Sequence, residues 1–264
     1  MHSRFPSKFS KELADRLVGY LSRPTRRYRR LGTTSPPDYA DWLLPGDLIL
    51  VEGNNRFSEI VKYITRSTWT HVAMYVGNIF DYPPRSLDAP VLIEADIHGG
   101  VIASPLQTYS GYNTRICRPV GLQTTDQEQL VDYMMGRLGH QYDLRNIVDL
   151  MRFLLPVPVV FSRHKRRYSA MGRGDPFEVI CSSIIAQAFQ SIRYPILPRR
   201  GQECTNDPAD THNLDLICVR HHTHITPRDF DLSPYFSVIK PTLKRGFQYR
   251  SLQWGKGTLS PAKT

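Results

Sequence analysis

Long apolar runs and regular cysteine patterns are both missing from this sequence of 264 residues. No stretch approaches the roughly 18 apolar residues of a membrane-spanning helix, and residues 1–30 lack the apolar run of an ordinary secretory signal. The cysteines form no CxxC pair, and a chain of this size does not need disulfide bonds. We therefore expect a globular protein with reduced thiols, located in the cytoplasm or peripherally on a membrane.

Signatures of several function classes are also missing. No zinc finger, helix-turn-helix or aromatic-interleaved basic motif is present, so no specific nucleic-acid partner is expected. Residues 172–174 lack the preceding strand and the Lys-Ser/Thr of a phosphate-binding loop. The histidines 221, 222 and 224, with His212 and Cys204 nearby, could bind a metal, but their spacing matches no zinc pattern. We predict neither a metal nor a cofactor.

Positive charge is abundant and unevenly placed. The chain has 34 Lys and Arg against 24 Asp and Glu, a formal charge of +10. Residues 1–30 hold nine basic residues and 240–256 hold five, while 163–167 reads Arg-His-Lys-Arg-Arg. Such segments are either solvated faces or surfaces attracted to anions. Because nucleic-acid motifs are missing, an anionic membrane surface is the favoured partner of the second kind.

Strand patterns precede helix patterns along the chain. Alternating or continuous apolar residues predict strands at 48–51, 70–77, 91–95, 101–103 and 113–119. Helical spacing predicts helices at 8–22, 57–64, 125–138, 144–155 and 181–192, with a capping box at Thr125 and Glu128 and a stop at Gly139. Strands followed by helices predict an α+β fold, a mostly antiparallel sheet with packed helices.

Three parts of the chain are distinguished by composition. We expect a basic N-terminal helix and a linker at residues 1–37, the main folded domain at residues 38–240, and a basic tail at residues 241–264. The helix at 8–22 either packs on the domain or lies in a membrane interface. Residues 156–176 are irregular, basic and partly apolar.

A histidine and a cysteine 110 residues apart are the main candidates for chemistry. His71 begins a predicted strand, and Cys181 opens a predicted helix. A thiol is nucleophilic as the thiolate, and a helix N-terminus and an imidazole both lower a thiol pKa. Glu94 interrupts an apolar strand and would orient the imidazole, a role for which Asp96 and His98 compete. Each residue also has a purely structural interpretation, since buried cysteines are usually inert.

Five short motifs in order carry a family resemblance. They are Pro45-Gly46-Asp47-Leu48-Ile49, Thr70-His71-Val72-Ala73-Met74-Tyr75, Ile93-Glu94-Ala95, Gly139-His140-Gln141-Tyr142-Asp143 and Ile180-Cys181-Ser182-Ser183. This order resembles the circularly permuted papain-like proteins of the NlpC superfamily, YaeF/YiiX type, over residues 43–195. The resemblance implies a permuted papain-like fold with Cys181 as nucleophile, His71 as base and acid, and Glu94 as the orienting residue.

The resemblance also implies an activity. We expect a cysteine hydrolase that cleaves amide bonds of the peptide type through a thioester. A lipid-directed acyl hydrolase or acyltransferase on a membrane surface is one alternative, and a non-catalytic binding module is another. Tyr142, which matches a recurrent family tyrosine, and Ser182 are expected to bind substrate or the oxyanion. The insertion at 156–176 would form a lid or a membrane-contact loop.

Overall fold

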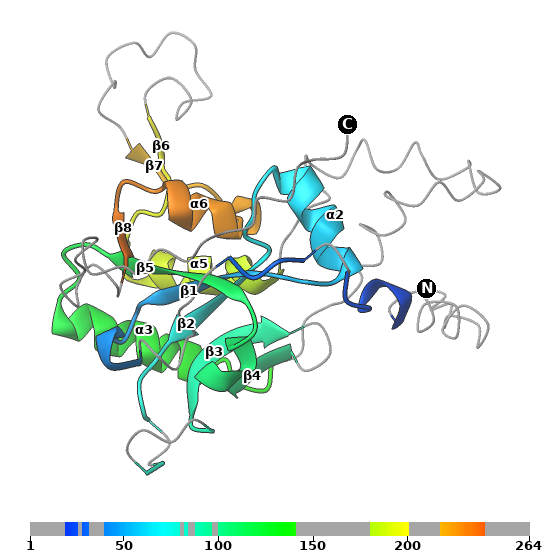
Figure 1. The fold of residues 1–264 in the computed structure, drawn as a ribbon. Coiled ribbons are helices and arrows are strands. Elements are labelled where there is room, and N and C mark those ends of the chain that lie inside the picture. The colour runs from blue at the N-terminus through cyan, green and yellow to red at the C-terminus, as the bar shows by residue number, and fades with distance from the viewer. Residues whose placement is uncertain are drawn as a thin grey trace, which may run out of the picture.

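A six-stranded antiparallel sheet forms the centre of the molecule (Figure 1). The computed structural model describes residues 19–25, 28–31, 40–79, 82–83, 88–96, 100–140, 180–200 and 217–240. The sheet order is β4-β3-β2-β1-β5-β8. The strands are β1 (Leu48–Glu52), β2 (His71–Tyr75), β3 (Pro90–Asp96), β4 (Gly100–Pro105), β5 (Asn113–Pro119) and β8 (Phe236–Ile239). A separate pair joins β6 (Arg199–Arg200) to β7 (Ile217–Cys218).

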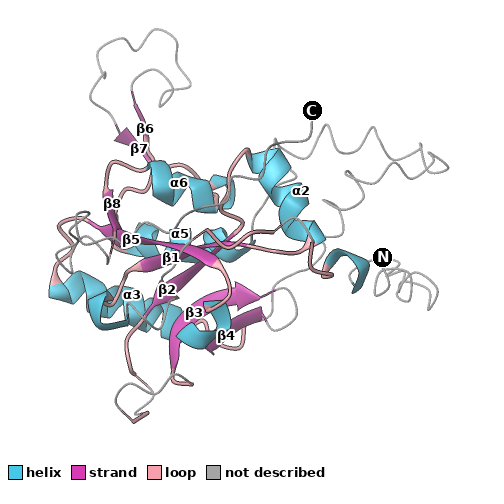
Figure 2. Ribbon diagram, in the orientation of Figure 1, coloured by secondary structure: helices cyan, strands magenta, loops and turns pink. Residues whose placement is uncertain are grey.

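Helices lie around this sheet (Figure 2). They are α2 (Arg56–Thr65), α3 (Thr124–Met135), α5 (Ile180–Ser191) and α6 (Pro227–Leu232), with 3-10 turns η2 (Leu106–Tyr109) and η5 (His222–His224). The predicted α+β class with an antiparallel sheet is confirmed. Among the described residues, no helix is both long and apolar enough to cross a membrane.

The two faces of the sheet bury different groups of side chains. On one face, α5 packs against β2 and β3, and α3 packs beside α5. Ile185, Ala188 and Phe189 of α5 are completely buried there. On the other face, residues 40–43 and η2 cover Ile49, Val51 and Ala73. Because both faces of the central strands are covered, β1 and β2 read as nearly continuous apolar runs.

The predicted strands and most predicted helices occur where the sequence places them. Asn55 caps α2, and its side chain accepts a hydrogen bond from the Ser58 backbone N–H at 2.8 Å. Gly46 has a φ of 91° in the turn before β1, a conformation that favours glycine. The cysteine helix, predicted from 181 to 192, is α5.

The predicted ends of the third helix were wrong. α3 begins at Thr124, and the Gln123 backbone N–H donates to the Asp126 carboxylate at 3.1 Å, so Thr125 and Glu128 form no capping box. The helix ends at Met135, four residues before Gly139, which has a φ of 77° in the following turn. Both errors arise because two adjacent segments offer similar capping residues, and side-chain geometry decides between them.

The polypeptide before the first strand contacts the body of the protein. The Thr25 N–H donates to the Asn54 carbonyl at 2.7 Å, and the Asn113 N–H donates to the Tyr28 hydroxyl at 2.6 Å. Residues 19–21 are helical and Ser22 forms a turn, while residues 8–18 of the predicted helix lie outside the described residues. So do the predicted helix 144–155, the insertion 156–176 and the tail 241–264. The three-part division of the chain stays a prediction.

A buried ion pair fixes the turn before β1. Asp47 is 1% exposed, and Arg118 of β5 donates from Nε to Oδ1 at 2.8 Å and from Nη2 to Oδ2 at 2.6 Å. The same Nη2 donates to the Trp42 carbonyl at 2.5 Å, and the Leu44 N–H donates to Asp47 Oδ2 at 2.9 Å. This network holds residues 42–47 against β5, so the Pro-Gly-Asp motif is structural.

We expect Asp47→Asn to lower the free energy of unfolding by about 3 kcal/mol, because breaking a buried pair leaves the partner charge uncompensated. Urea denaturation monitored by circular dichroism measures the change. Asp41→Asn, an exposed carboxylate on the same segment, serves as the control and should change stability by less than about 0.5 kcal/mol. Equal effects of the two substitutions would contradict the assignment.

Candidate active site

His71 and Glu94 lie on neighbouring strands. β2 pairs with β3 through Met74 opposite Ile93. One step further along this register, Glu94 stands opposite Ala73 and diagonal to His71, on the same face of the sheet. Because the Ala73 side chain is small, the carboxylate reaches past it, and Glu94 Oε2 is hydrogen-bonded to His71 Nε2.

The Glu94 carboxylate is buried and accepts several hydrogen bonds. Its side chain is 4% exposed. The Ser104 hydroxyl donates to Oε1, and the Tyr109 hydroxyl donates to Oε2, which also faces His71. Every partner offers a proton, which is the arrangement that stabilises an ionised carboxylate in a buried position.

Cys181 lies in the first turn of α5. It is a free thiol, 6% exposed, and it lies near enough to His71 to raise the pKa of the imidazole. The N–H groups in the first turn of a helix have no acceptor within that helix, and the helix dipole favours negative charge there. The fold therefore brings His71 between a carboxylate and a thiol that are 87 residues apart in sequence.

The electrostatics of His71 and Glu94 agree with this geometry. Burial lowers the pKa of His71, but the charges and hydrogen bonds of Cys181 and Glu94 outweigh burial, so the pKa lies well above the ordinary 6.5. Burial raises the pKa of Glu94, but His71, Ser104 and Tyr109 outweigh it, so the pKa lies below the ordinary 4.5. Both shifts favour a charged imidazolium–carboxylate pair, and the His71 side chain remains 24% exposed.

Two members of this network carry no signal in the sequence. Ser104 pairs in register with Leu92, which places it diagonal to Glu94, and Tyr109 belongs to η2 just after β4. The His71 and Tyr109 rings lie 6.0 Å apart between centroids. Burial and the Glu94 charge raise the pKa of Tyr109 well above 10, so its hydroxyl remains a donor. The register of β3 and β4 was needed to find both residues.

The other residues predicted for the site are Ser182, Asp96, Tyr142 and His98, and the structure describes the first two. The Ser182 side chain is buried, and its hydroxyl donates to the Ile225 carbonyl at 2.5 Å. Asp96 ends β3 opposite Gly100, two residues beyond Glu94. Tyr142 and His98 lie outside the described residues. Among the candidates for orienting the imidazole, Glu94 is hydrogen-bonded to His71.

The histidine cluster belongs to a different part of the molecule. His222 Nδ1 lies 2.8 Å from Ser183 Oγ and 3.2 Å from Gln187 Nε2 on α5. Within the described part of the chain, no three His, Cys, Asp or Glu side chains are grouped to hold a metal ion. His212 and Cys204 lie outside those residues.

Residues 43–152 match a family of permuted papain-like amidase enzymes, the YaeF/YiiX, C92 family. The family resemblance is thereby confirmed. The matched segment contains His71 and Glu94 and ends before Cys181. At the coarse level this match supports an amidase-type hydrolase.

Two further comparisons complete the picture. Among solved structures, the metalloprotein YiiX from Escherichia coli O157:H7 is similar, with 14% identity and a TM-score of 0.43. The similarity covers 74% of this chain and 96% of that protein. A comparison with curated protein sequences gave no match.

We expect the buried carboxylate of Glu94 to make the free energy of unfolding fall at acidic pH. Because the folded pKa of Glu94 lies below 4.5, its stabilisation is present above that pH and is lost as pH falls through the folded pKa. Glu94→Gln should flatten the stability change between about pH 5 and pH 3, as measured by urea unfolding at each pH.

The His71 contribution has the opposite sign, because a raised pKa stabilises below 6.5 and the stabilisation is lost at higher pH. The pH range in which the His71 stabilisation is lost therefore lies above the acidic range in which the Glu94 stabilisation is lost. The control is Glu59→Gln, since Glu59 is exposed and pairs with Lys62. If Glu94→Gln leaves the loss of stability at acidic pH unchanged, the ionised, paired state of Glu94 is contradicted.

Proposed function

We propose that this protein is a cysteine hydrolase that cleaves amide bonds of the peptide type through a thioester intermediate. Cys181 is the nucleophile, His71 the general base and acid, and Glu94 the residue that orients His71. The observation that carries the proposal is the position of the His71 imidazole, which contacts the Glu94 carboxylate and the Cys181 thiol. The reaction requires no cofactor.

The first half-reaction forms the acyl-enzyme. The Cys181 sulfur attacks the carbonyl carbon after its proton has passed to His71. The resulting oxyanion accepts a hydrogen bond from the Cys181 backbone N–H at the start of α5, with Ser182 and Tyr142 as further candidates. The imidazolium then protonates the leaving amine, the C–N bond breaks, and a thioester remains on Cys181.

The second half-reaction restores the enzyme. His71, now neutral, takes a proton from water as the water attacks the thioester carbonyl. The C–S bond breaks, the carboxylic acid leaves, and the sulfur of Cys181 again pairs with His71. Glu94 binds Nε2 throughout, which leaves Nδ1 facing the sulfur and fixes the imidazole in one orientation.

Acyl lipids are the second class of substrate. The basic segments at 1–30 and 240–256 give the chain charge that favours an anionic membrane surface. On such a surface the same thioester would pass its acyl group to water or to an amine acceptor. A binding module that retains the fold is the third alternative, and the contacts that His71 makes with Glu94 and Cys181 favour an enzyme over it.

We expect iodoacetamide to label Cys181 rapidly near pH 7 and His71→Ala to slow this labelling about tenfold. An ordinary thiol is only a few per cent thiolate at that pH, so loss of the imidazolium removes most of the nucleophile. Mass spectrometry of labelled peptides measures the rate at each cysteine.

Cys117 supplies an internal control. It is completely buried, and burial raises its pKa to about 12, so it should remain unlabelled in the folded protein. Rapid labelling of Cys181 that does not depend on His71 would refute the nucleophile assignment and favour the binding module.

We expect turnover of peptide amides, and Glu94→Gln should lower kcat by about 10²- to 10⁴-fold because the imidazole loses its orienting charge. Peptide p-nitroanilides and phosphatidylcholine vesicles containing a primary amine form the substrate panel. Release of amine from the peptides supports the amidase. Acyl transfer from the vesicles alone would overturn it in favour of the lipid enzyme, and Cys181→Ser is the inactive control.

A further inference from the structure

A polar cleft of about 620 Å³ opens at one end of the sheet, within the size range of small-molecule sites. Its walls come from the end of β1, the start of β5, the turn after α2, and α6. The charged residues lining it are Glu52, Arg66, Arg115, Arg228 and Asp231. We call it the arginine cleft. It is separate from the catalytic residues, none of which lines it.

Both acidic residues of the cleft are already neutralised. Asp231 accepts from Arg115 Nη1 at 2.6 Å through Oδ1 and from Trp69 Nε1 at 3.0 Å through Oδ2. The Arg115 guanidinium also lies 5.0 Å from the centre of the Trp69 ring. One arginine and one indole therefore occupy both oxygens of this carboxylate.

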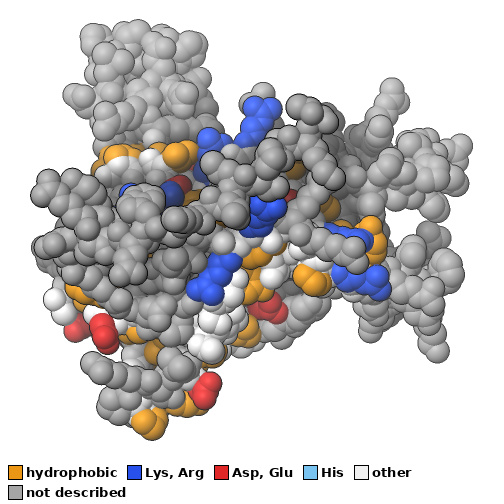
Figure 3. Space-filling model, viewed as in Figure 1, with side chains coloured by type: hydrophobic (Ala, Val, Ile, Leu, Met, Phe, Trp, Pro, Cys, Tyr) orange, Lys and Arg blue, Asp and Glu red, His pale blue; other side chains and the backbone are white. Residues whose placement is uncertain are grey.

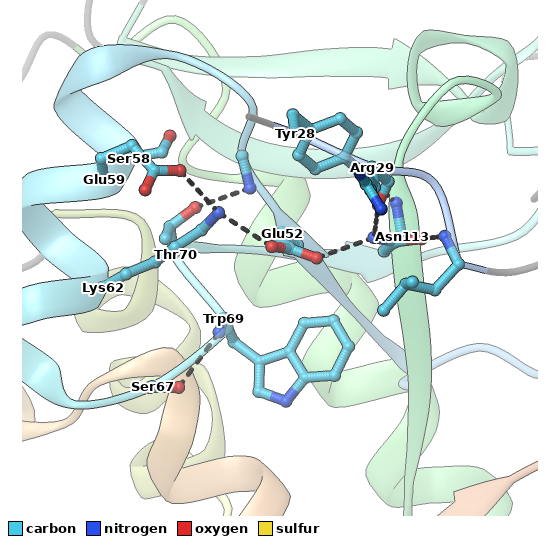
Figure 4. A network of polar contacts seen from close by, with 12 residues as sticks. Tyr28, Arg29, Glu52, Ser58, Glu59, Lys62, Ser67, Trp69, Thr70 and Asn113 are labelled. Carbon is cyan, nitrogen blue, oxygen red and sulfur yellow. Dashed lines mark hydrogen bonds and ion pairs between the residues drawn. The ribbon is translucent and has the colours of Figure 1, made fainter. Parts of the chain in front are cut away.

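Both carboxylate oxygens of Glu52 likewise accept hydrogen bonds from neighbouring side chains (Figure 4). Lys62 Nζ donates to Oε1 at 2.8 Å, and Asn113 Nδ2 donates to Oε2 at 2.7 Å. Asn113 is in turn held by its N–H to Tyr28 and by Oδ1, which accepts from the Leu31 N–H at 2.7 Å. Hydrogen bonds thus hold both Glu52 and Asn113 in place in this wall of the cleft.

Two arginines keep uncompensated charge. Among the described residues, neither Arg66 nor Arg228 pairs with a carboxylate, and one Nη atom of Arg228 donates to the Thr65 carbonyl at 3.2 Å. Both are exposed. Lys and Arg side chains are visible beside α2 and α6 in Figure 3. A planar guanidinium presents several N–H donors in a fork that matches carboxylate and phosphate oxygens.

The backbone of Arg66 is unusual. It ends α2 with φ 48° and ψ 44°, and its N–H caps the Lys62 carbonyl. Glycine is the usual residue in this left-handed position, and a side chain there costs roughly 1 kcal/mol. The chain therefore retains an arginine at the mouth of the cleft where glycine would be less strained.

The arginine cleft lies close to the catalytic residues. Val51 pairs with His71 on one side and with Thr114, a cleft residue, on the other. Two strand spacings therefore separate Thr114 from His71, about 10 Å. Tyr112 of the cleft also packs edge-on against Tyr109 at 5.8 Å between ring centroids, and Tyr109 donates to Glu94.

We propose that the arginine cleft, whose residue Thr114 lies two strand spacings from His71, binds an anionic group of the substrate, a carboxylate or a phosphate. Arg66 and Arg228 recognise the anion, and Trp69, Arg115 and Asp231 line the same cleft. The inference rests on the proposed function for the part that concerns cleavage. The binding of an anion stands on the cleft alone.

A direct titration tests the binding of the anion. Calorimetry with inorganic phosphate and with succinate at low ionic strength should detect one site in the full-length protein. The double variant Arg66→Gln/Arg228→Gln should weaken both affinities at least about tenfold, since hydrogen bonds to charged groups are among the stronger ones. Arg193→Gln is the matched control, because Arg193 is also exposed and left-handed, with φ 56°, but lies outside the cleft.

The result that would overturn the inference is equal phosphate affinity in the wild type and the double variant, or no binding to either. Vesicles of phosphatidylserine provide a second arm. If the double variant loses vesicle binding but keeps its phosphate affinity, the arginines belong to a membrane-contact surface and the inference is wrong.

Turnover provides the third arm. With an amide substrate that carries a free carboxylate, the double variant should raise KM about tenfold and leave kcat unchanged. The methyl ester of the same substrate should show no such change. If neither substrate is cleaved although Cys181 is alkylated rapidly, the proposed function is wrong. The phosphate titration then still tests whether the arginine cleft binds an anion.

Discussion

The buried, ionised carboxylate of Glu94 constrains the surrounding structure more than any other group. A charge removed from water is tolerated only where hydrogen bonds and an opposite charge replace the lost hydration. Ser104, Tyr109 and His71 supply these from two strands and a 3-10 turn. The register of β2, β3 and β4 is thereby linked to the site, since a one-residue slip would move these side chains to the opposite face.

The second half of the site comes from a helix rather than the sheet. α5 is held by apolar packing against β2 and β3, and its first turn carries Cys181 to the start of β2. His71 is the first residue of that strand, so its side chain lies at the end of the sheet and keeps partial exposure. A buried carboxylate and a partly exposed imidazole are thus compatible within one site.

The same end of the sheet carries the arginine cleft. Glu52 ends β1, Asn113 begins β5, and Trp69 lies just before β2, which His71 begins. The ion pairs there neutralise the acids and leave two arginines facing solvent. The local excess of positive charge is therefore produced by pairing and not by composition alone, and it lies outside the basic segments at 1–30 and 240–256 that dominate the sequence.

Local pattern determined much of this protein. Apolar alternation located the strands, helical spacing located α2, and five ordered motifs indicated the family and pointed to His71, Glu94 and Cys181. These features depend on residues close in sequence, whose spacing reflects strand and helix periodicity. Only the tertiary structure decided the cap of α3, the hydrogen bond between Glu94 and His71, and the positions of Ser104, Tyr109, Arg66 and Arg228. Those depend on register and on contacts between distant segments, which the periodicity of a single segment does not encode.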